Sequence, residues 1–251
     1  DRASWLENRT ARIAAGGIGS TTAAALLGLS PWKTPWEVWA QVHSPHLLSS
    51  RKTDSASERR MARGLALEGL ADKIYSERMN AETFGVAEHM SIGHSGGVLV
   101  SSPDAFATCM DDVGVAEYKV VQPWYRDQWP DGDLEVSTIA DLDAASVFGR
   151  WPISQQYVVQ GMVHLLCSGL DFCDVFAIFA KDVQLGHNVE GWDTPVAVEG
   201  TACLRIWRND ETLAAVLASI LSAHEEIIAN GIEPVDSAPP APWDPTREPL
   251  S

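Results

Sequence analysis

Three charged residues in the middle of the chain have the types and the spacing of a metal-binding centre. Asp104 follows Pro103, and one residue separates Glu117 from Lys119. Successive side chains on a strand point to opposite faces, so Glu117 and Lys119 would share a face while Tyr118 points away. Two carboxylates beside an ammonium offer hard oxygen ligands that suit Mg²⁺ or Mn²⁺, completed by water and a substrate phosphate. The alternative is a surface turn and an exposed, salt-bridged strand face.

Two predicted strands would position these groups. Residues 98–100 are β-branched and apolar and predict one strand, and residues 113–121 predict a second strand after a turn at 111–114. If these strands pair, Asp104 at the end of the first lies beside Glu117 on the second. The Pro-Asp pair followed by Glu-x-Lys then resembles the PD-(D/E)xK signature of nucleases.

A glycine-rich turn lies near the N-terminus. Gly16, Gly17 and Gly19 precede Ser20, which is predicted to be the N-cap of a short Ala/Leu helix that ends at Gly28. Free N–H groups and the helix dipole at such an N-terminus favour an anion. The turn is not a Walker loop, because that loop would end in Gly-Lys-Ser/Thr. A capped surface helix is the alternative.

The following stretch carries a more specific resemblance. Thr34 and Glu37 form a capping box with Pro35 at the first helical position, which predicts a helix to about residue 42. The chain resembles the YqaJ-like viral recombinase and lambda-exonuclease-like family of nucleases over about residues 9–235, with the motifs in the expected order. The N-terminal motifs are Ile18-Gly19-Ser20, then Leu27-Gly28-Leu29-Ser30-Pro31-Trp32-Lys33-Thr34-Pro35, then Trp39.

This resemblance implies roles for the central residues. Asp104 and Glu117 would hold two Mg²⁺ or Mn²⁺ ions, with the backbone carbonyl of Tyr118 as a further ligand. Lys119 would orient the attacking water or help to deprotonate it. The implied reaction is the hydrolysis of a phosphodiester bond.

Two other parts of the chain would complete the site. Residues 57–77 predict a long helix, and the resemblance implies that its Glu68 extends the site to the second ion. A solvated glutamate is the alternative. Arg12 and Ser20, beside the glycine turn, match positions at which the family holds a terminal 5′ phosphate, although the spacing differs slightly here.

A second predicted helix covers residues 153–167 and carries a Tyr-x-x-Gln pattern. Tyr157 and Gln160 are three residues apart and therefore lie on one face of this helix. The resemblance implies that both support the metal site. Alternatively, Tyr157 packs in the core and Gln160 caps a backbone group. His164 on the same helix is interpreted as structural, because no neighbour in the sequence completes a nucleophile–base pair.

The remaining pattern predicts an α/β fold with a PD-(D/E)xK, restriction-endonuclease-like core, in which helices flank a mixed central sheet. We expect one nuclease domain over residues 1–235 and a Pro-rich, disordered tail over residues 236–251. The other predicted elements are one or two strands in 82–100, a loop-rich insertion at 122–151 with a short helix near 138–147, a strand at 175–180, an acidic loop at 186–199, a strand at 201–207 and a helix at 210–230.

The formal net charge of −16 is unusual for a protein that binds nucleic acid, but the charge is unevenly distributed. Residues 1–63 carry a net charge of +4, whereas residues 64–181 carry −11 and residues 182–251 carry −9. Contacts with phosphate are therefore expected from the N-terminal segment. An acidic centre with a basic rim is compatible with a metal-dependent nuclease.

The cysteines and the apolar runs restrict the class of protein. The four cysteines form no CxxC pair, which argues against zinc and iron–sulfur sites and predicts buried thiols in a reducing compartment. No signal-peptide pattern and no apolar run of about 18 residues is present, so we expect a cytoplasmic protein without a membrane partner, in the bacterial host cytoplasm if a phage encodes it. The four are Cys109, Cys167, Cys173 and Cys203.

Three functions are compatible with these features. The first, implied by the resemblance, is a Mg²⁺-dependent 5′→3′ exonuclease that acts on double-stranded DNA ends and leaves 3′ single-stranded tails for phage-type recombination. It would work with a single-strand annealing protein and form a homo-oligomer, with a trimer implied by the family. The second is a restriction-type or other endonuclease of this fold. The third is a non-catalytic DNA-end binding protein, against which the presence of all three signature side chains argues.

Overall fold

The structure is a computed structural model of the chain. Arg12, the tail at 236–251 and most of the helix predicted near 138–147 lie outside the residues that it describes. The described residues are 17–48, 55–84, 92–93, 97–138, 140–141, 155–182 and 196–235.

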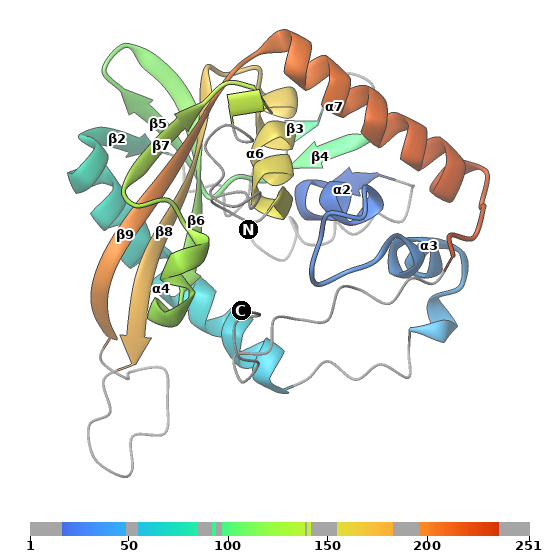
Figure 1. The fold of residues 1–251 in the computed structure, drawn as a ribbon, viewed down its shortest axis with the longest axis horizontal. Helices are drawn as coiled ribbons and strands as arrows, with labels where there is room; N and C mark the ends of the chain where they lie inside the picture. Colours follow the sequence, from blue (N-terminus) through green and yellow to red (C-terminus); the bar gives the residue numbers. More distant parts are fainter. Residues whose placement is uncertain are drawn as a thin grey trace.

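A mixed six-stranded sheet forms the centre of the molecule, in the order β2-β5-β6-β8-β9-β7 (Figure 1). β5 and β6 form an antiparallel hairpin, β8 runs parallel to β6, β9 is antiparallel to β8, and β7 is parallel to β9. This sheet confirms the predicted mixed α/β fold. The strands are β2 (Ala81–Phe84), β5 (Ala105–Cys109), β6 (Asp112–Val121), β7 (Asp133–Val136), β8 (Phe172–Asp182) and β9 (Val196–Trp207).

A second, three-stranded sheet lies beside the first. β4 (Leu99–Ser101) pairs in parallel with β1 (Ile18–Gly19) and antiparallel with β3 (Ile92–Gly93). The predicted pairing of the strand before Asp104 with the strand of Glu117 is therefore wrong. It is β5, the strand after Asp104, that pairs with the strand of Glu117.

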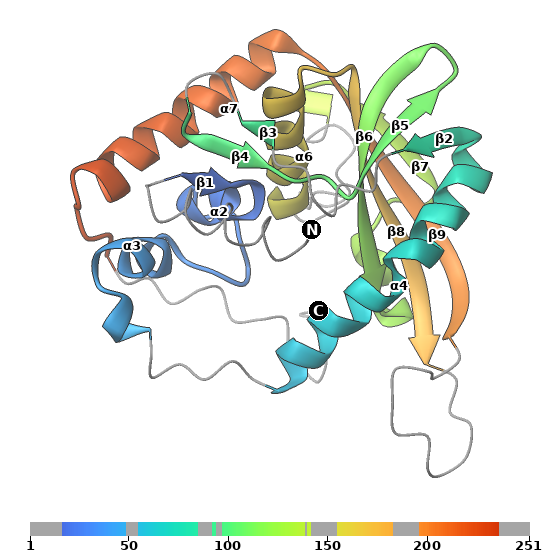
Figure 2. The ribbon, with the colours of Figure 1, turned by 180° about the vertical axis from the view of Figure 1, so that it is seen from behind.

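Helices cover both faces of the large sheet (Figures 1 and 2). α4 (Ser55–Met79) lies on one face, where Tyr75 packs edge-on against Phe176 of β8. α6 (Gln155–Ser168) lies on the other face, with α2 (Ser20–Leu26) and α7 (Asp210–Ala223) beyond it. The remaining helical segments are α3 (Pro35–His43), η1 (Pro45–Leu47), η3 (Pro123–Gln128) and the π-helical turn η4 (His224–Ala229).

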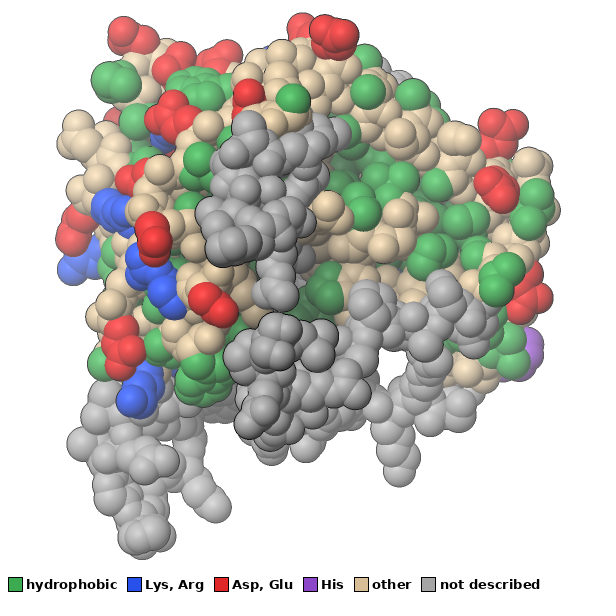
Figure 3. All heavy atoms as spheres, in the orientation of Figure 1, with side chains coloured by type: hydrophobic (Ala, Val, Ile, Leu, Met, Phe, Trp, Pro, Cys, Tyr) green, Lys and Arg blue, Asp and Glu red, His purple; other side chains and the backbone are tan. Residues whose placement is uncertain are grey.

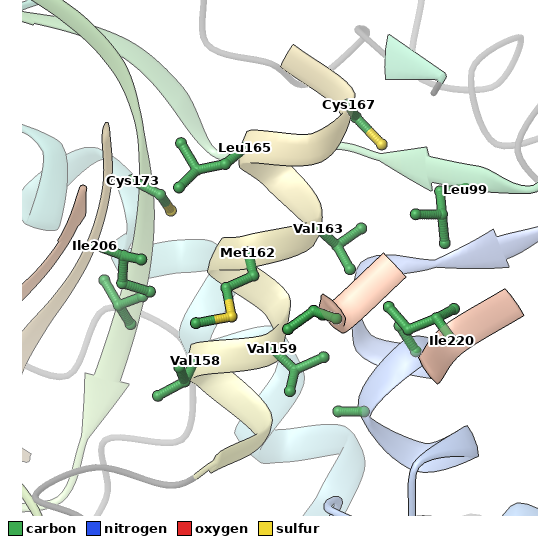
Figure 4. Close-up of a cluster of buried hydrophobic side chains, with 14 of the residues drawn as sticks. Leu99, Val158, Val159, Met162, Val163, Leu165, Cys167, Cys173, Ile206 and Ile220 are labelled. Atoms are coloured by element: carbon green, nitrogen blue, oxygen red, sulfur yellow. The ribbon is translucent and has the colours of Figure 1, made fainter. Parts of the chain in front are cut away.

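α6 is the centre of the larger hydrophobic core (Figure 4). It is buried on almost all sides, as expected for a helix between two layers. Gly161 allows its close approach to the sheet, because a Cβ there would lie 2.7 Å from Cδ1 of Ile206. Of the labelled core side chains, Val158, Val159, Met162, Val163, Leu165 and Cys167 belong to α6 itself, and Leu99, Cys173, Ile206 and Ile220 come from the elements around it.

The helix starts show one correct and one wrong prediction. The capping box at α3 is present, because the Thr34 side chain accepts from the Glu37 N–H and the Glu37 side chain accepts from the Thr34 N–H. The predicted N-cap of α2 is wrong by one position. Gly19 is the N-cap and makes no side-chain hydrogen bond there, while Ser20 is the first helical residue and is buried.

Three strand predictions need correction. β5 was not predicted, β7 lies inside the expected loop-rich insertion, and β9 begins at Val196, within the expected acidic loop. β7 forms the edge of the sheet through its pairing with β9, so this part of the insertion belongs to the fold. The four cysteines are free and buried, as predicted.

The helix Asp210–Ala229, made of α7 and η4, is long and apolar enough by composition to cross a membrane, with a mean hydropathy of 1.4. Its Leu213, Val216 and Ile220 are buried in the same core as α6, whereas 28% of the apolar window as a whole is buried. Figure 3 shows acidic side chains at both ends of this helix and an uncharged surface between them.

Candidate active site

The backbone of β6 fixes the position of Asp104. The Asp104 N–H donates to the Ala116 carbonyl at 3.1 Å, and Oδ2 of Asp104 accepts from the Tyr118 N–H at 2.6 Å. These two bonds lie on either side of Glu117 in the sequence of β6. Asp104 and Glu117 are therefore brought together by a local hairpin and not by the end of β4.

Glu117 is the most heavily bonded side chain of the site. It is only 6% exposed, and its Oε1 accepts from Lys119 Nζ at 2.6 Å and from Gln160 Nε2 at 2.6 Å. Its Oε2 lies 3.1 Å from Nε2 of His164. The strand places Glu117 and Lys119 together on the face that α6 covers, as alternation predicts.

The Tyr-x-x-Gln pair of α6 lies over this carboxylate and its ammonium. The Lys119 Nζ is 4.9 Å from the ring centroid of Tyr157, within the range of a cation–π contact. The ring of Tyr157 also packs against Trp129 at a centroid distance of 5.8 Å. Both predicted residues of α6 therefore contact the Glu117–Lys119 pair, Gln160 by a hydrogen bond and Tyr157 by its ring.

His164 belongs to this site, although the sequence interpretation made it purely structural. Gln156, Gln160 and His164 are each four residues apart and form a buried polar stripe on an otherwise apolar helix. That stripe was visible in the sequence and was the signal for His164. Its partner Glu117 is distant in sequence, so the contact itself could not be read from spacing.

Burial and neighbouring charges shift the pKa values of Asp104 and Glu117 in opposite directions. Burial and the neighbouring Glu117 raise the pKa of Asp104 well above its usual range, against the opposing effects of Lys119 and the Tyr118 N–H. Burial alone would also raise the pKa of Glu117, but Lys119 and His164 outweigh it and lower this pKa to about 2. Burial would lower the pKa of Lys119, but Glu117 outweighs it and the pKa is raised.

The Tyr118 side chain lies on the other face of β6, towards α4, the helix that carries Glu68. The Tyr118 hydroxyl donates to Oδ1 of Asp72 on α4 at 2.6 Å. Glu68 lines an open pocket with Tyr118 and Val120. The charge of Glu68 contributes to the raised pKa of Asp104, so the two carboxylates interact across the edge of the site.

The donor set fits a divalent cation in chemistry but is not a ready-made metal cage. Among the residues that the structure describes, no three Asp, Glu, His or Cys side chains are gathered closely enough to bind a metal. Asp104 nevertheless lies close to the Glu117–Lys119 pair, and burial followed by the charge of Glu117 raises the pKa of Asp104. Oε1 of Gln160 is buried without a hydrogen-bond partner in the described part of the chain.

The predicted phosphate-binding pair is only partly described. Ser20 is buried at the start of α2, directly after β1, and Arg12 lies outside the described residues. β1 pairs with β4, whose last residue, Ser101, contacts His164 of the site. The small sheet thus connects the start of α2 to the carboxylate centre.

The fold and the arrangement around β6 define an α/β domain of the PD-(D/E)xK type. Residues 4–171 match the model of the YqaJ-like viral recombinase domain, and the chain belongs to this family. This confirms the resemblance found in the sequence. Comparison with curated proteins gives no match.

Two solved structures show the same fold. One is an alkaline exonuclease (LHK-Exo) from Laribacter hongkongensis, 17% identical, with 91% of this chain and 93% of that chain covered and a TM-score of 0.55. The other is LHK-Exo in complex with dAMP, 17% identical, with 87% of this chain and 91% of that chain covered and a TM-score of 0.54. At this level of identity the likeness shows the fold alone.

Proposed function

We propose that this protein is a metal-dependent deoxyribonuclease, and specifically a 5′→3′ exonuclease that acts on double-stranded DNA ends and leaves 3′ single-stranded tails. The observation that carries the proposal is the convergence of Asp104, Glu117 and Lys119 on one end of the β5–β6 hairpin. Membership in the YqaJ-like viral recombinase family supports a role in phage-type recombination.

Each residue of the centre has a part in this reaction. Asp104 and Glu117 would hold the cation, with the Tyr118 carbonyl as a further ligand and Glu68 extending the site towards a second ion. Bound Mg²⁺ or Mn²⁺ would supply Lewis-acid stabilisation of the charge that develops on the attacking and leaving oxygens. Burial and the charge of Glu117 raise the pKa of Asp104, and a bound cation would counter both effects by favouring the carboxylate.

Lys119 is assigned the task of orienting the attacking water. The raised pKa of Lys119 means that its side chain is an ammonium, which can donate hydrogen bonds but cannot accept a proton. Orientation is therefore favoured over deprotonation of the water. Gln160 and Tyr157 hold the Glu117–Lys119 pair from α6 and would keep both groups in place during the reaction.

The DNA end is proposed to bind at the N-terminal segment. Arg12 and Ser20 would hold a terminal 5′ phosphate, since this segment contains the basic part of an otherwise acidic chain. A ring-like homo-oligomer, with a trimer as the expected form, would keep DNA close to the site despite the net charge. The expected protein partner is a single-strand annealing protein that takes up the 3′ tail.

A digestion assay with linear and closed-circular forms of one duplex tests the proposal. We expect degradation of the linear form in Mg²⁺, faster with a 5′ phosphate than with a 5′ hydroxyl, and an intact circle. Arg12→Ala should shrink the advantage of the 5′ phosphate by roughly 1.5–3 kcal/mol for a lost charge-assisted bond. The ends must be compared at one salt concentration, because phosphate contacts weaken as salt rises. Cleavage of the circle would instead indicate an endonuclease.

A further inference from the structure

Ser101 and His164 form a buried chain of contacts that ends on Glu117. Oγ of Ser101 lies 2.5 Å from Nδ1 of His164, and Nε2 of His164 lies 3.1 Å from Oε2 of Glu117. Ser101 is 1% exposed and His164 is fully buried. The two residues come from different elements, Ser101 from β4 of the small sheet and His164 from α6.

The chemistry of Glu117 fixes the direction of its hydrogen bond with His164. Glu117 is paired with Lys119 and is a carboxylate, which only accepts. Nε2 of His164 must therefore carry a proton and donate to Glu117. Nδ1 of His164 contacts the Ser101 hydroxyl, which can either donate or accept a hydrogen bond. Ser101 thus fixes the orientation of the imidazole that binds the carboxylate.

A Ser-His-Glu array also occurs in hydrolases with a nucleophilic serine, but burial excludes that role for this array. The Ser101 hydroxyl lies in the interior, where no substrate atom can reach it. Glu117 is moreover shared with Lys119 and Gln160, so it does not serve the histidine alone. The array begins in the core at Ser101 and ends on Glu117, as expected if Ser101 and His164 hold a carboxylate that binds a metal.

We propose that Ser101 and His164 are positioning residues, which hold Oε2 of Glu117 in the orientation that receives a divalent cation. The inference rests on the proposed function, because it assigns Glu117 to the cation. Lys119 and Gln160 both bind Oε1, so His164 is the partner that the structure shows for Oε2. The contacts at Oε1 and Oε2 together fix the plane of the carboxylate, because a turn about its last torsion would move both oxygens.

The contact also connects the two sheets of the molecule. β4 carries Ser101 and pairs with β1, which leads directly into Ser20 and α2. A displacement of the small sheet would therefore reach Glu117 through two hydrogen bonds.

The test compares Mn²⁺ binding, followed by electron paramagnetic resonance, in four variants of the full chain. Removal of a group that orients a metal ligand typically weakens metal binding by about 10- to 100-fold, and we expect this for His164→Leu. Ser101→Ala should weaken Mn²⁺ binding as well. His164→Gln places an amide N–H where Nε2 stood and should restore much of the affinity. Ser30→Ala is the matched control, since Ser30 is also buried and donates to Gln156 of α6 at 2.7 Å, away from Glu117.

A second readout does not depend on the cation. In ¹⁵N-labelled, metal-free protein, the imidazole signal that His164→Gln removes should show a proton on Nε2, and Ser101→Ala should change that signal. Ser30→Ala should lower stability without changing this signal or the Mn²⁺ affinity.

The outcomes separate the two proposals. Unchanged Mn²⁺ affinity in Ser101→Ala and His164→Leu, with wild-type protein that binds Mn²⁺ and digests DNA, would overturn the positioning role alone. An Nε2 without a proton in the wild-type protein would overturn it without any metal present. If the wild-type protein neither binds Mn²⁺ nor digests DNA, the proposed function fails, and the imidazole measurement still decides the hydrogen-bond chain. Should His164→Leu not fold, Ser101→Ala and His164→Gln carry the test.

Discussion

Replacement of Lys119 by methionine should expose how strongly the site is held together by charge. Lys119 Nζ is 2.6 Å from Oε1 of Glu117, and both side chains are largely buried, with 17% and 8% of their surface exposed. Methionine keeps an apolar stem of similar length but removes the ammonium. The carboxylate of Glu117 would then be left in the interior with hydrogen bonds from Gln160 and His164 only.

The expected cost follows from this geometry. Removing one partner of a buried ion pair typically costs about 3–5 kcal/mol, because the other charge stays buried without compensation. Since Gln160 and His164 remain, we expect the lower end, about 3 kcal/mol at pH 7. A domain of this size loses about 2–4 °C of Tm per kcal/mol, so Tm should fall by about 6–12 °C.

The measurement is urea and thermal unfolding without divalent ions, for wild-type protein, Lys119→Met, Glu117→Gln and the double variant Glu117→Gln, Lys119→Met. The double variant carries neither charge and should recover most of the lost stability, which a double-mutant cycle detects as strong coupling. Glu117 has a folded pKa of about 2, below its reference value of about 4.3, so its ionisation stabilises the wild-type fold above that reference and this contribution is lost towards pH 2. A Lys119→Met variant within 1 kcal/mol of wild type, or a double variant no more stable than the single one, would refute the reasoning.

Two further perturbations test the carboxylate pair and the sheet. Asp104→Asn should abolish cleavage yet raise the Tm at pH 8 without divalent ions. Because the pKa of Asp104 is raised in the folded protein, the wild-type protein loses the stabilising protonated form as pH rises through that pKa, so the Tm difference between variant and wild type should narrow towards pH 5. An unchanged Tm at pH 8 would contradict this reasoning. Gly114→Ala should destabilise by about 1–3 kcal/mol, because its Cβ would lie 2.5 Å from the Phe172 carbonyl oxygen. Gly69→Ala on α4 is the matched control, since a Cβ there meets nothing within 4 Å, and equal losses in urea unfolding would argue against the close contact.

Local rules predicted much of the arrangement on β6. Side-chain alternation along one strand is a property of the backbone, so the common face of Glu117 and Lys119 followed from the sequence. The capping box of Thr34 and Glu37 was equally readable, because both partners lie within one helical turn. The roles of the site residues in binding metal, binding phosphate and catalysis stay predictions.

The pairing of strands could not be read in the same way. β5 has the sequence Ala-Phe-Ala-Thr-Cys, whose small residues give a weak strand signal, and it was missed although it forms the hairpin with β6. β4 overlaps the apolar run at 98–100, which contains two valines, so this strand was assigned the place that β5 occupies. Register and partner choice depend on packing against α4 and α6, which no local pattern records.

Only part of the role of α6 could be predicted from the sequence. Its length and its Tyr157–Gln160 pair followed from helical spacing, but His164 was judged by its neighbours in sequence. The partners of His164 are Ser101 and Glu117, which come from two different sheets. Only the four-residue spacing of buried polar side chains indicated that this histidine belonged with Gln160.

The most direct test of the account is the release of nucleotides from a linear duplex with 5′ phosphates by wild-type protein and by Glu117→Gln, with Mg²⁺ and with a chelator. Glutamine keeps the shape of the side chain that Gln160 and His164 hold, but removes the charge that a cation requires. The account predicts rapid release by the wild-type protein in Mg²⁺, none with the chelator, and none by folded Glu117→Gln in either condition. Comparable release by Glu117→Gln in Mg²⁺ would contradict it.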